Sequence, residues 1–478
     1  MYNVAIIGAG VIGASVAREL GKYNLKVCVI EKSFDISEGT TKANSGIVHS
    51  GVDAKPGTLK AKYNVRGNEM FDELQNELEF PFKRNGSLIL CFEEEGIKNL
   101  KEIKKQGEIN GVPNISILTQ EEVRKMEPNI SDEVVAALYA PTGGIVCPYE
   151  YTVALCENAY TNGVEFKLNE IVEDITKDEN HYVIKTNKGM IKADLVVNAA
   201  GLYSDTINNM VSKNKIEIVA RKGEYCLFDK IAGKIASKTL FQLPTAMGKG
   251  VLVSPTVDGN LLVGPNAVDI DNKYDVTTSK EALDDILEKG KRSIKEVPMR
   301  NIITSFSGLR AHNVAGDFVV GEAEDAKNFI NAAGVESPGL TSAPAIGEAI
   351  REIIVEKLNP SKKDNFIAKR KAIPRFRDLS NEERTNLIKE NPQYGKIVCR
   401  CEKITEGEIV EAIKRPLGAT TLDGVKKRTR ATMGGCQGGF CTAPIIDLLA
   451  RELNIDKTEV KKNGGSSYIL IGENKENL

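Results

Sequence analysis

Four cysteines near the C-terminus are the residues best suited to chemistry. The chain has nine cysteines, and four of them, Cys399, Cys401, Cys436 and Cys441, form two close pairs. Two pairs of soft thiolates suit either one tetrahedral zinc ion or the two irons of a [2Fe-2S] cluster, and the spacing alone leaves both open. The odd total and the single dense cluster favour a metal or redox site in reduced cytosol over a disulfide framework.

The surroundings of these cysteines favour an anionic cluster. Thr442 and Pro444 are typical of the start of a helix, which we expect to run to about Leu453, so that its positive end faces the thiolates. Four basic residues precede this helix: Lys426, Lys427, Arg428 and Arg430. They either offset the charge of the cluster, or form a solvated face or a docking patch for an acidic partner.

A second candidate site is the glycine-rich turn near the N-terminus. An apolar run from Val4 leads into Gly8, Gly10 and Gly13, and apolar residues at helical spacing follow. The first glycine permits a tight turn, the second lets the backbone approach a pyrophosphate, and the third lets the helix pack closely on the strand. A second apolar run ends at Glu31, which is placed to accept hydrogen bonds from ribose hydroxyls. This unit predicts a site for NAD or FAD.

Candidate catalytic residues are few, because the chain has only three histidines. His49 lies among small residues that let the backbone pass close to a flat ring, which favours a role in the site. His181 is expected at the exposed edge of a hairpin, and His312 is expected to pack behind the residues that contact a ligand. Arg310 is the expected anion-binding residue, because a planar guanidinium binds a carboxylate or phosphate bidentately. Further candidates for anion contacts are Lys60, Lys62, Arg221 and Lys222, although the segment that holds the last two also fits a strand edge.

The elements that must position these residues form an α/β pattern. Apolar runs over residues 193–201 and 328–334 end in small residues, and the second leads into a helix expected at about 343–357. The nucleotide domain is therefore assembled from separated segments. Alternating strands predicted between them, at 86–92, 250–254 and 260–264, indicate a mixed sheet packed over that domain.

Composition excludes several classes of protein. Lys and Arg total 64 and Asp and Glu 66, so the net charge of -2 provides no overall attraction to nucleic acid or to an anionic membrane. The apolar stretch from Val4 to Ala17 is too short to span a bilayer and no basic segment precedes it, so neither a transmembrane segment nor a signal peptide is expected. We expect a cytoplasmic protein that is peripheral to a membrane only through a partner.

Three segments resemble flavoproteins of the D-amino-acid oxidase superfamily: residues 39–51, Asn198-Ala-Ala-Gly201 and residues 335–341. The resemblance covers nearly all of residues 1–358 and implies FAD rather than NAD. It also implies an α/β fold, in which an FAD-binding Rossmann-like domain carries an inserted mixed-sheet substrate domain. Beyond the fingerprint glycines and Glu31, the cofactor-binding residues that it implies are Ser45, Gly46, Ala200, Gly201, Gly334, Gly339, Leu340 and Thr341.

The cysteine segment resembles the bacterioferritin-associated ferredoxin-like [2Fe-2S] domain. The likeness rests on Cys-x-Cys-Glu at 399–402, on the run from Gly418 to Lys426, and on Cys-Gln-Gly-Gly-Phe-Cys at 436–441. It implies a small α-rich domain in which the four cysteines hold an iron–sulfur cluster, with zinc as the less favoured occupant.

Parts of the chain resemble two subfamilies of this superfamily, and the two resemblances imply different substrates. Residues 44–51 and 55–60 resemble L-2-hydroxyglutarate dehydrogenases. The whole arrangement, with residues 142–148, 252–256 and 262–265 and the fused cysteine domain, is more similar to anaerobic-type glycerol-3-phosphate dehydrogenase subunits. A departure is that the several basic residues expected to cage a phosphate are not all identifiable.

The second resemblance implies oxidation of sn-glycerol 3-phosphate, with His49 as the base and Arg310 on the phosphate. Electrons would leave through the [2Fe-2S] cluster to a partner subunit or an acceptor flavoprotein. The alternatives are oxidation of another 2-hydroxyacid or an amine, an electron-transfer subunit without its own substrate site, and a C-terminal domain in which zinc has only a structural role.

The expected domains are as follows. An FAD-dependent oxidoreductase spans 1–358, with FAD-binding parts at about 1–80, 145–215 and 325–358 and substrate-domain parts at about 81–144 and 216–324; a linker spans 359–394, the [2Fe-2S] domain 395–456 and a C-terminal tail 457–478.

Overall fold

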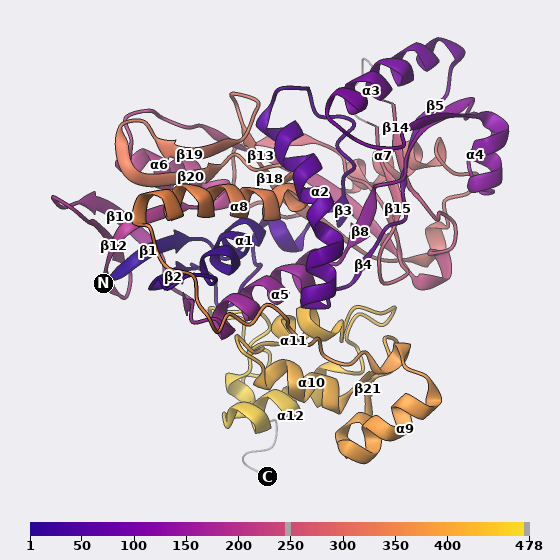
Figure 1. Ribbon diagram of the computed structural model, residues 1–478. Coiled ribbons are helices and arrows are strands. Elements are labelled where there is room, and N and C mark those ends of the chain that lie inside the picture. The colour runs from indigo at the N-terminus through magenta and orange to yellow at the C-terminus, as the bar shows by residue number, and fades with distance from the viewer. Residues whose placement is uncertain (244–249, 473–478) are drawn as a thin grey trace.

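The computed structural model describes residues 1–243 and 250–472, and one of its two main sheets joins widely separated segments (Figure 1). β1 (Tyr2–Ile7) lies between β2 (Val27–Ile30) and β12 (Gly189–Asn198) and is parallel to both. On its other side β12 pairs in parallel with β20 (Ala326–Ala333). The carboxyl ends of strands from three parts of the chain therefore meet at one edge of this sheet.

Helices cover this sheet with apolar faces. α1 (Val11–Leu20) packs on both α5 (Pro148–Thr161) and α8 (Gly339–Leu358), and α8 also packs on α2 (Leu59–Leu78). α8 begins at Gly339, a turn earlier than the sequence indicated, because Pro344 is accommodated within the helix. The remaining elements at this sheet are β9 (Glu165–Lys167), β10 (Val172–Lys177), β11 (Tyr182–Thr186), α6 (Ser204–Val211) and β19 (Val319–Ala323).

The second main sheet is mixed, as predicted, because β14 runs parallel to β5 while its other pairs are antiparallel. In spatial order its strands are β17 (Val268–Ile270), β13 (Ile218–Phe228), β16 (Leu261–Val263), β15 (Val253–Pro255), β14 (Thr239–Gln242), β5 (Ser87–Cys91), β7 (Ala136–Ala140) and β6 (Ser116–Thr119), and β18 (Ile302–Asn313) pairs with β13. The helices beside it are α3 (Ile97–Ile109), α4 (Gln120–Met126) and α7 (Lys280–Lys291).

A small three-stranded sheet connects the two larger ones. β8 (Gly144–Val146) pairs with β3 (Ile47–Val48) on one side and with β4 (Phe82–Lys83) on the other. Because β3 follows the segment 39–46 directly, this sheet fixes that segment between the two main sheets.

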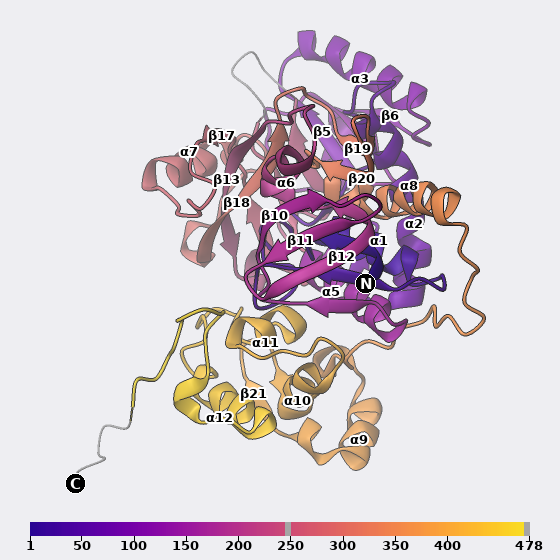
Figure 2. The ribbon, with the colours of Figure 1, turned by 90° about the vertical axis from the view of Figure 1, so that its left-hand side faces the viewer.

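The C-terminal part is a separate α-rich lobe below α5 (Figure 1, Figure 2). Its elements are α9 (Asn381–Glu390), β21 (Ile397–Cys399), β22 (Ile404–Thr405), α10 (Glu406–Lys414), α11 (Leu422–Thr429) and α12 (Thr442–Leu453). Apolar residues of α10, α11 and α12 form its own core, and α11 packs on α5.

The segment 359–394 differs from the irregular linker expected from the sequence. Helix α9 lies within it and begins with a capping box, in which the Ser380 hydroxyl accepts from the Glu383 amide and the Glu383 carboxylate accepts from the Ser380 amide. The basic composition of the segment obscured this signal. The last six residues of the predicted tail, 473–478, lie outside the described residues, and the domain boundaries stay predictions.

Within residues 1–243 and 250–472, no helix has the length and apolar character needed to cross a membrane. The cytoplasmic location stays a prediction.

Candidate active site and cofactor sites

A cavity of about 1420 Å³ extends from the glycine turn to the second main sheet and reaches the C-terminal lobe. Its wall contains most of the residues that the sequence indicated for the cofactor and the substrate. The predicted members are Gly8, Gly10, Glu31, Ser45, Gly46, His49, Ala200, Gly201, Arg310, Gly339 and Leu340, whereas Gly13, Gly334 and Thr341 are not part of the wall.

The glycine turn has the close approaches that its sequence predicts. Gly8 has φ +107°, and a Cβ there would lie 2.5 Å from the Ala199 carbonyl oxygen. A Cβ on Gly13 would lie 1.9 Å from the Gly8 oxygen, so only glycine lets α1 pack this closely on β1. Gly10 is the N-cap of α1 and provides no side chain, which leaves the positive end of the helix open to the cavity.

Glu31 closes the same end of the cavity. Its carboxylate accepts hydrogen bonds from the backbone N–H groups of Ala9 and Ser33, both at 2.8 Å. These bonds hold the carboxylate at the end of β2, where a ribose would meet it. The helix terminus, the glycine cradle and this acid together fit the ADP part of a dinucleotide.

The segment expected beneath the flavin lies against β8. Gly46 has φ +64°, and a Cβ there would lie 2.6 Å from the Val146 carbonyl oxygen, so a side chain does not fit. The Ser45 hydroxyl donates a weak hydrogen bond of 3.4 Å to the hydroxyl of Tyr225, whose ring stacks on that of Phe306 with 4.7 Å between centroids. Small residues and flat rings thus border a space suited to a planar cofactor.

His49 projects from the end of β3 into this space. Its backbone N–H donates to the Thr341 hydroxyl at 2.9 Å, and its carbonyl oxygen accepts from Asn68 at 2.9 Å. Its Nε2 lies 3.4 Å from the hydroxyl of Ser337, and its ring centroid lies 5.7 Å from that of Phe241. Thr341 therefore supports the histidine from behind the wall, which explains its place near the site.

Arg310 lies on β18 in the part of the wall formed by the second sheet. One Nη donates to the Asn266 carbonyl oxygen at 2.6 Å, and its buried Nε has no hydrogen-bond partner in the described chain. Arg310 lines the cavity, and its remaining terminal N–H groups can donate to an anionic ligand. The two residues predicted to act on a substrate therefore line one cavity, although their roles stay predictions.

The further candidates for anion contacts do not line this cavity. Lys60 binds Glu336 at 2.8 Å, Arg221 binds Asp269 at 2.6 Å, and Lys222 binds Asp275 at 3.1 Å. Lys62 lies over the Tyr63 ring. These residues are therefore structural ion pairs or packed side chains in this structure, and the expectation that they contact the anion is not supported.

Glu336 is a wall residue that sequence reasoning missed. It accepts from Lys60 and pairs with His312, whose Nδ1 lies 3.0 Å from the carboxylate. Burial alone would raise the pKa of Glu336, but these two partners hold it below its usual value. His312 thus packs behind the site, as predicted, and its partner could not be identified without the fold.

The four C-terminal cysteines are arranged as two pairs. The thiol of Cys399 interacts with that of Cys441, and the thiol of Cys401 interacts with that of Cys436. A tetrahedral zinc would hold all four sulfurs about 3.8 Å apart. Among the described residues these cysteines provide no three sulfurs that all lie within 4.8 Å of one another. Two separate pairs fit the two irons of a [2Fe-2S] cluster better than one zinc.

The basic run after Gly424 forms part of the junction between the lobes. Arg428 binds Asp35 through both terminal nitrogens at 2.8 Å, and Lys427 binds Asp35 at 3.0 Å and also Glu38. Arg430 binds the buried carboxylate of Asp258 at 2.8 Å. The interpretation of these three residues as a solvated face or a docking patch is therefore wrong, because acidic residues of the first lobe neutralise them.

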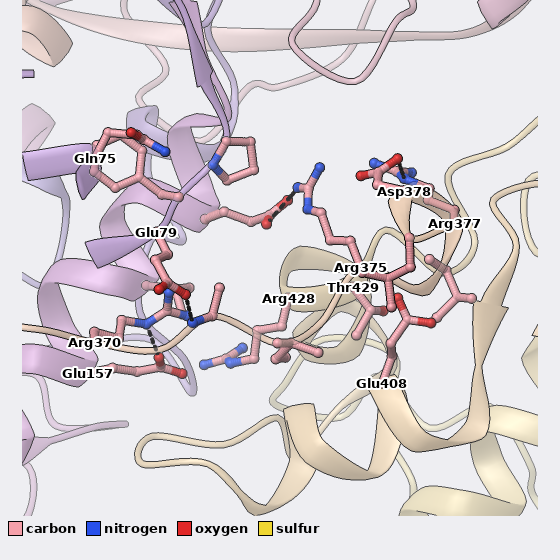
Figure 3. A pocket seen from close by; sticks show the side chains of 18 residues that line it. Gln75, Glu79, Glu157, Arg370, Arg375, Arg377, Asp378, Glu408, Arg428 and Thr429 are labelled. Carbon is pink, nitrogen blue, oxygen red and sulfur yellow. Dashed lines mark hydrogen bonds and ion pairs between the residues drawn. The ribbon is translucent and has the colours of Figure 1, made fainter. Parts of the chain in front are cut away.

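A smaller cavity of about 330 Å³ lies at the same junction. Figure 3 shows Arg370 beside Glu157 on one side of it and Arg377 beside Asp378 on the other. Its arginines already have carboxylate partners, and burial raises the pKa of the lining residue Glu408 to about 7. The charges of this cavity are thus balanced within the protein.

The large cavity, the glycine turn and the paired cysteines define a two-domain redox protein that binds a dinucleotide and an iron–sulfur cluster. Residues 3–353 match the FAD dependent oxidoreductase family, and residues 397–451 match the BFD-like [2Fe-2S] binding domain. The chain belongs to the FAD dependent oxidoreductase family. Its cofactors are FAD and a [2Fe-2S] cluster, and both predicted resemblances are confirmed.

Individual relatives agree with this assignment. The chain is 54% identical to the glycerol 3-phosphate dehydrogenase of Caloramator mitchellensis over 99% of both chains. It is 35% identical to the glycerol 3-phosphate oxidase of Mycoplasma genitalium, over 74% of this chain and 95% of that protein. The structure of dithionite-reduced L-alpha-glycerophosphate oxidase from Mycoplasma pneumoniae with FAD bound superposes with a TM-score of 0.73 at 33% identity, covering 77% of this chain and 98% of that one.

Proposed function

We propose that the chain oxidises sn-glycerol 3-phosphate to dihydroxyacetone phosphate. The observation that carries this proposal is the 54% identity, over 99% of both chains, with a protein named glycerol 3-phosphate dehydrogenase. The relatives named glycerol 3-phosphate oxidase support the same substrate for the first lobe. A small anionic substrate also matches the guanidinium group of Arg310, a residue that lines the cavity.

In this proposal Arg310 holds the phosphate, and His49 takes the proton of the secondary hydroxyl through its ring nitrogen. The bonds to the backbone of His49 fix its position in the wall, while the Asn266 carbonyl fixes the orientation of Arg310. FAD, when bound, accepts the hydride from the alcohol carbon. Loss of one proton and one hydride balances the conversion of the alcohol to a ketone.

The two electrons then leave one at a time through the [2Fe-2S] cluster to a partner subunit or an acceptor flavoprotein. Met433 and Gln437 support this route, because they line the same cavity as the cofactor residues and Gln437 is adjacent to Cys436. The cysteine loop thus borders the cavity that fits FAD, which suits transfer between the two cofactors within one chain.

The test is an anaerobic spectrum of the purified protein, with iron and labile sulfide assayed, before and after addition of glycerol 3-phosphate. Bleaching of the flavin with partial reduction of the cluster is the expected result. An unchanged flavin in iron-containing protein would refute glycerol 3-phosphate as the direct donor. L-2-Hydroxyglutarate, added in parallel, tests the competing substrate, and a flavin that neither compound bleaches would favour an electron-transfer subunit.

A further inference from the structure

Lys426 differs from its basic neighbours on α11. Lys427, Arg428 and Arg430 are ion-paired across the junction, whereas no hydrogen bond or ion pair joins the side chain of half-buried Lys426 to any described residue. Burial lowers the pKa of this lysine, and the carboxylate of Asp423 on the same helix opposes that effect only in part. Withdrawing an ammonium group from water without a partner is unfavourable, so the position calls for an anion.

The place of Lys426 in the cavity indicates which anion. It lines the cavity that also contains Gly10 and Val11, where the positive end of α1 meets the pyrophosphate of a bound dinucleotide. Lys42 lies close enough to lower the pKa of Lys426 further, and it follows Thr41, whose hydroxyl oxygen accepts from the Val11 N–H at 3.1 Å. Lys42 itself is bound to Glu38, so it is not a free cation.

We propose that Lys426 binds a phosphate group of FAD, so that the [2Fe-2S] domain completes the FAD site of the first lobe. The ion pairs of Lys427 and Arg428 fix α11 against the segment 35–38, which holds Lys426 at the cavity without using its charge. The proposal depends on FAD as the cofactor and not on the identity of the substrate.

The experiment compares Lys426→Gln, Lys426→Arg and Lys414→Gln in the full-length holoenzyme. Lys414 is an exposed lysine of the same domain that binds Glu452 at 2.7 Å, so it is a matched control. Release of FAD is measured by equilibrium dialysis and by flavin fluorescence on dilution, at several NaCl concentrations, with iron content as a check of folding. Lys426→Gln should weaken FAD binding about ten-fold or more and reduce its salt dependence, because a charge-assisted bond is lost. Lys426→Arg and Lys414→Gln should stay near wild type.

An iron-replete Lys426→Gln protein with unchanged FAD affinity would overturn the proposal. A raised KM for glycerol 3-phosphate with unchanged FAD affinity would also overturn it and place Lys426 in the substrate site. If Lys426→Gln fails to retain iron, amine labelling of the wild type decides: FAD should slow acetylation of Lys426 several-fold relative to Lys414, and equal labelling with and without FAD would refute the idea.

Discussion

Arg310→Ala should lower kcat/KM for glycerol 3-phosphate roughly a hundredfold. In the structure one Nη of Arg310 is bound to the Asn266 carbonyl oxygen, and the Nε has no partner in the described chain. That leaves the second Nη without a hydrogen-bond partner among the described residues, and its two N–H groups can form charge-assisted hydrogen bonds to a phosphate. At about 1.5 kcal/mol or more each, their loss raises the barrier by about 3 kcal/mol, which corresponds to roughly a hundredfold in rate.

The assay is anaerobic steady-state reduction of an artificial acceptor, normalised to bound FAD. Arg221→Ala is the matched control, because Arg221 lies directly opposite Arg310 in the β13–β18 register, yet binds Asp269 and is not part of the cavity wall. It should change kcat/KM by less than about threefold. Equal losses in the two variants, or no loss in Arg310→Ala, would refute the assignment of Arg310 to the phosphate.

Three further expectations concern the cluster and the junction. Cys401→Ala should lose iron and labile sulfide but keep FAD. Glycerol 3-phosphate should still bleach the flavin of this variant, while turnover with the natural acceptor fails. Sustained turnover would argue against electron transfer through the cluster. Asp258→Asn should lower the free energy of unfolding in urea by about 3–5 kcal/mol, because buried Arg430 and partly buried Arg375 and Arg377 lose the buried carboxylate that they share. A loss below about 1 kcal/mol would contradict this. Burial raises the pKa of Glu408 from 4.5 to about 7, so the folded state holds this proton more tightly than the unfolded state does. The free energy of unfolding should therefore be highest below pH 4.5 and should fall by about 3 kcal/mol as the pH rises through 7. Glu408→Gln should flatten that fall in pH-dependent denaturation, and an unchanged profile would show that Glu408 is not its source.

Sequence reasoning succeeded where chemistry is local. The turn at Gly8 and Gly13 requires close backbone contacts within a short strand–helix unit, and the structure shows those contacts. The cysteine segment likewise carries its ligands and its capping helix in one continuous stretch, and α12 begins at Thr442, directly after the last cysteine. In such cases the pattern and the three-dimensional site share the same few residues.

Prediction was poorer for charged residues whose ion-pair partners are far away in the sequence. Lys60 was a candidate for anion binding, but it pairs with Glu336, which is 276 positions away in the chain. Arg428 was expected either to offset the charge of the cluster or to belong to a solvated face or docking patch, but it is paired with Asp35 from the first lobe. A single sequence shows that a residue is basic and does not show which carboxylate the topology places beside it.

The junction shows why buried charges join the two lobes. Arg430 binds Asp258, which lines the cavity, and also Glu402, which is adjacent to Cys401, at 2.8 and 3.1 Å. Both carboxylate side chains are only 2% exposed, so much of the attraction is offset by the cost of removing the charges from water. Apolar contacts would stabilise a junction at least as well, but they would allow the lobes to slide. Directional bonds from one guanidinium to both lobes instead fix the cysteine loop against the cavity wall, as the proposed electron transfer between FAD and the cluster requires.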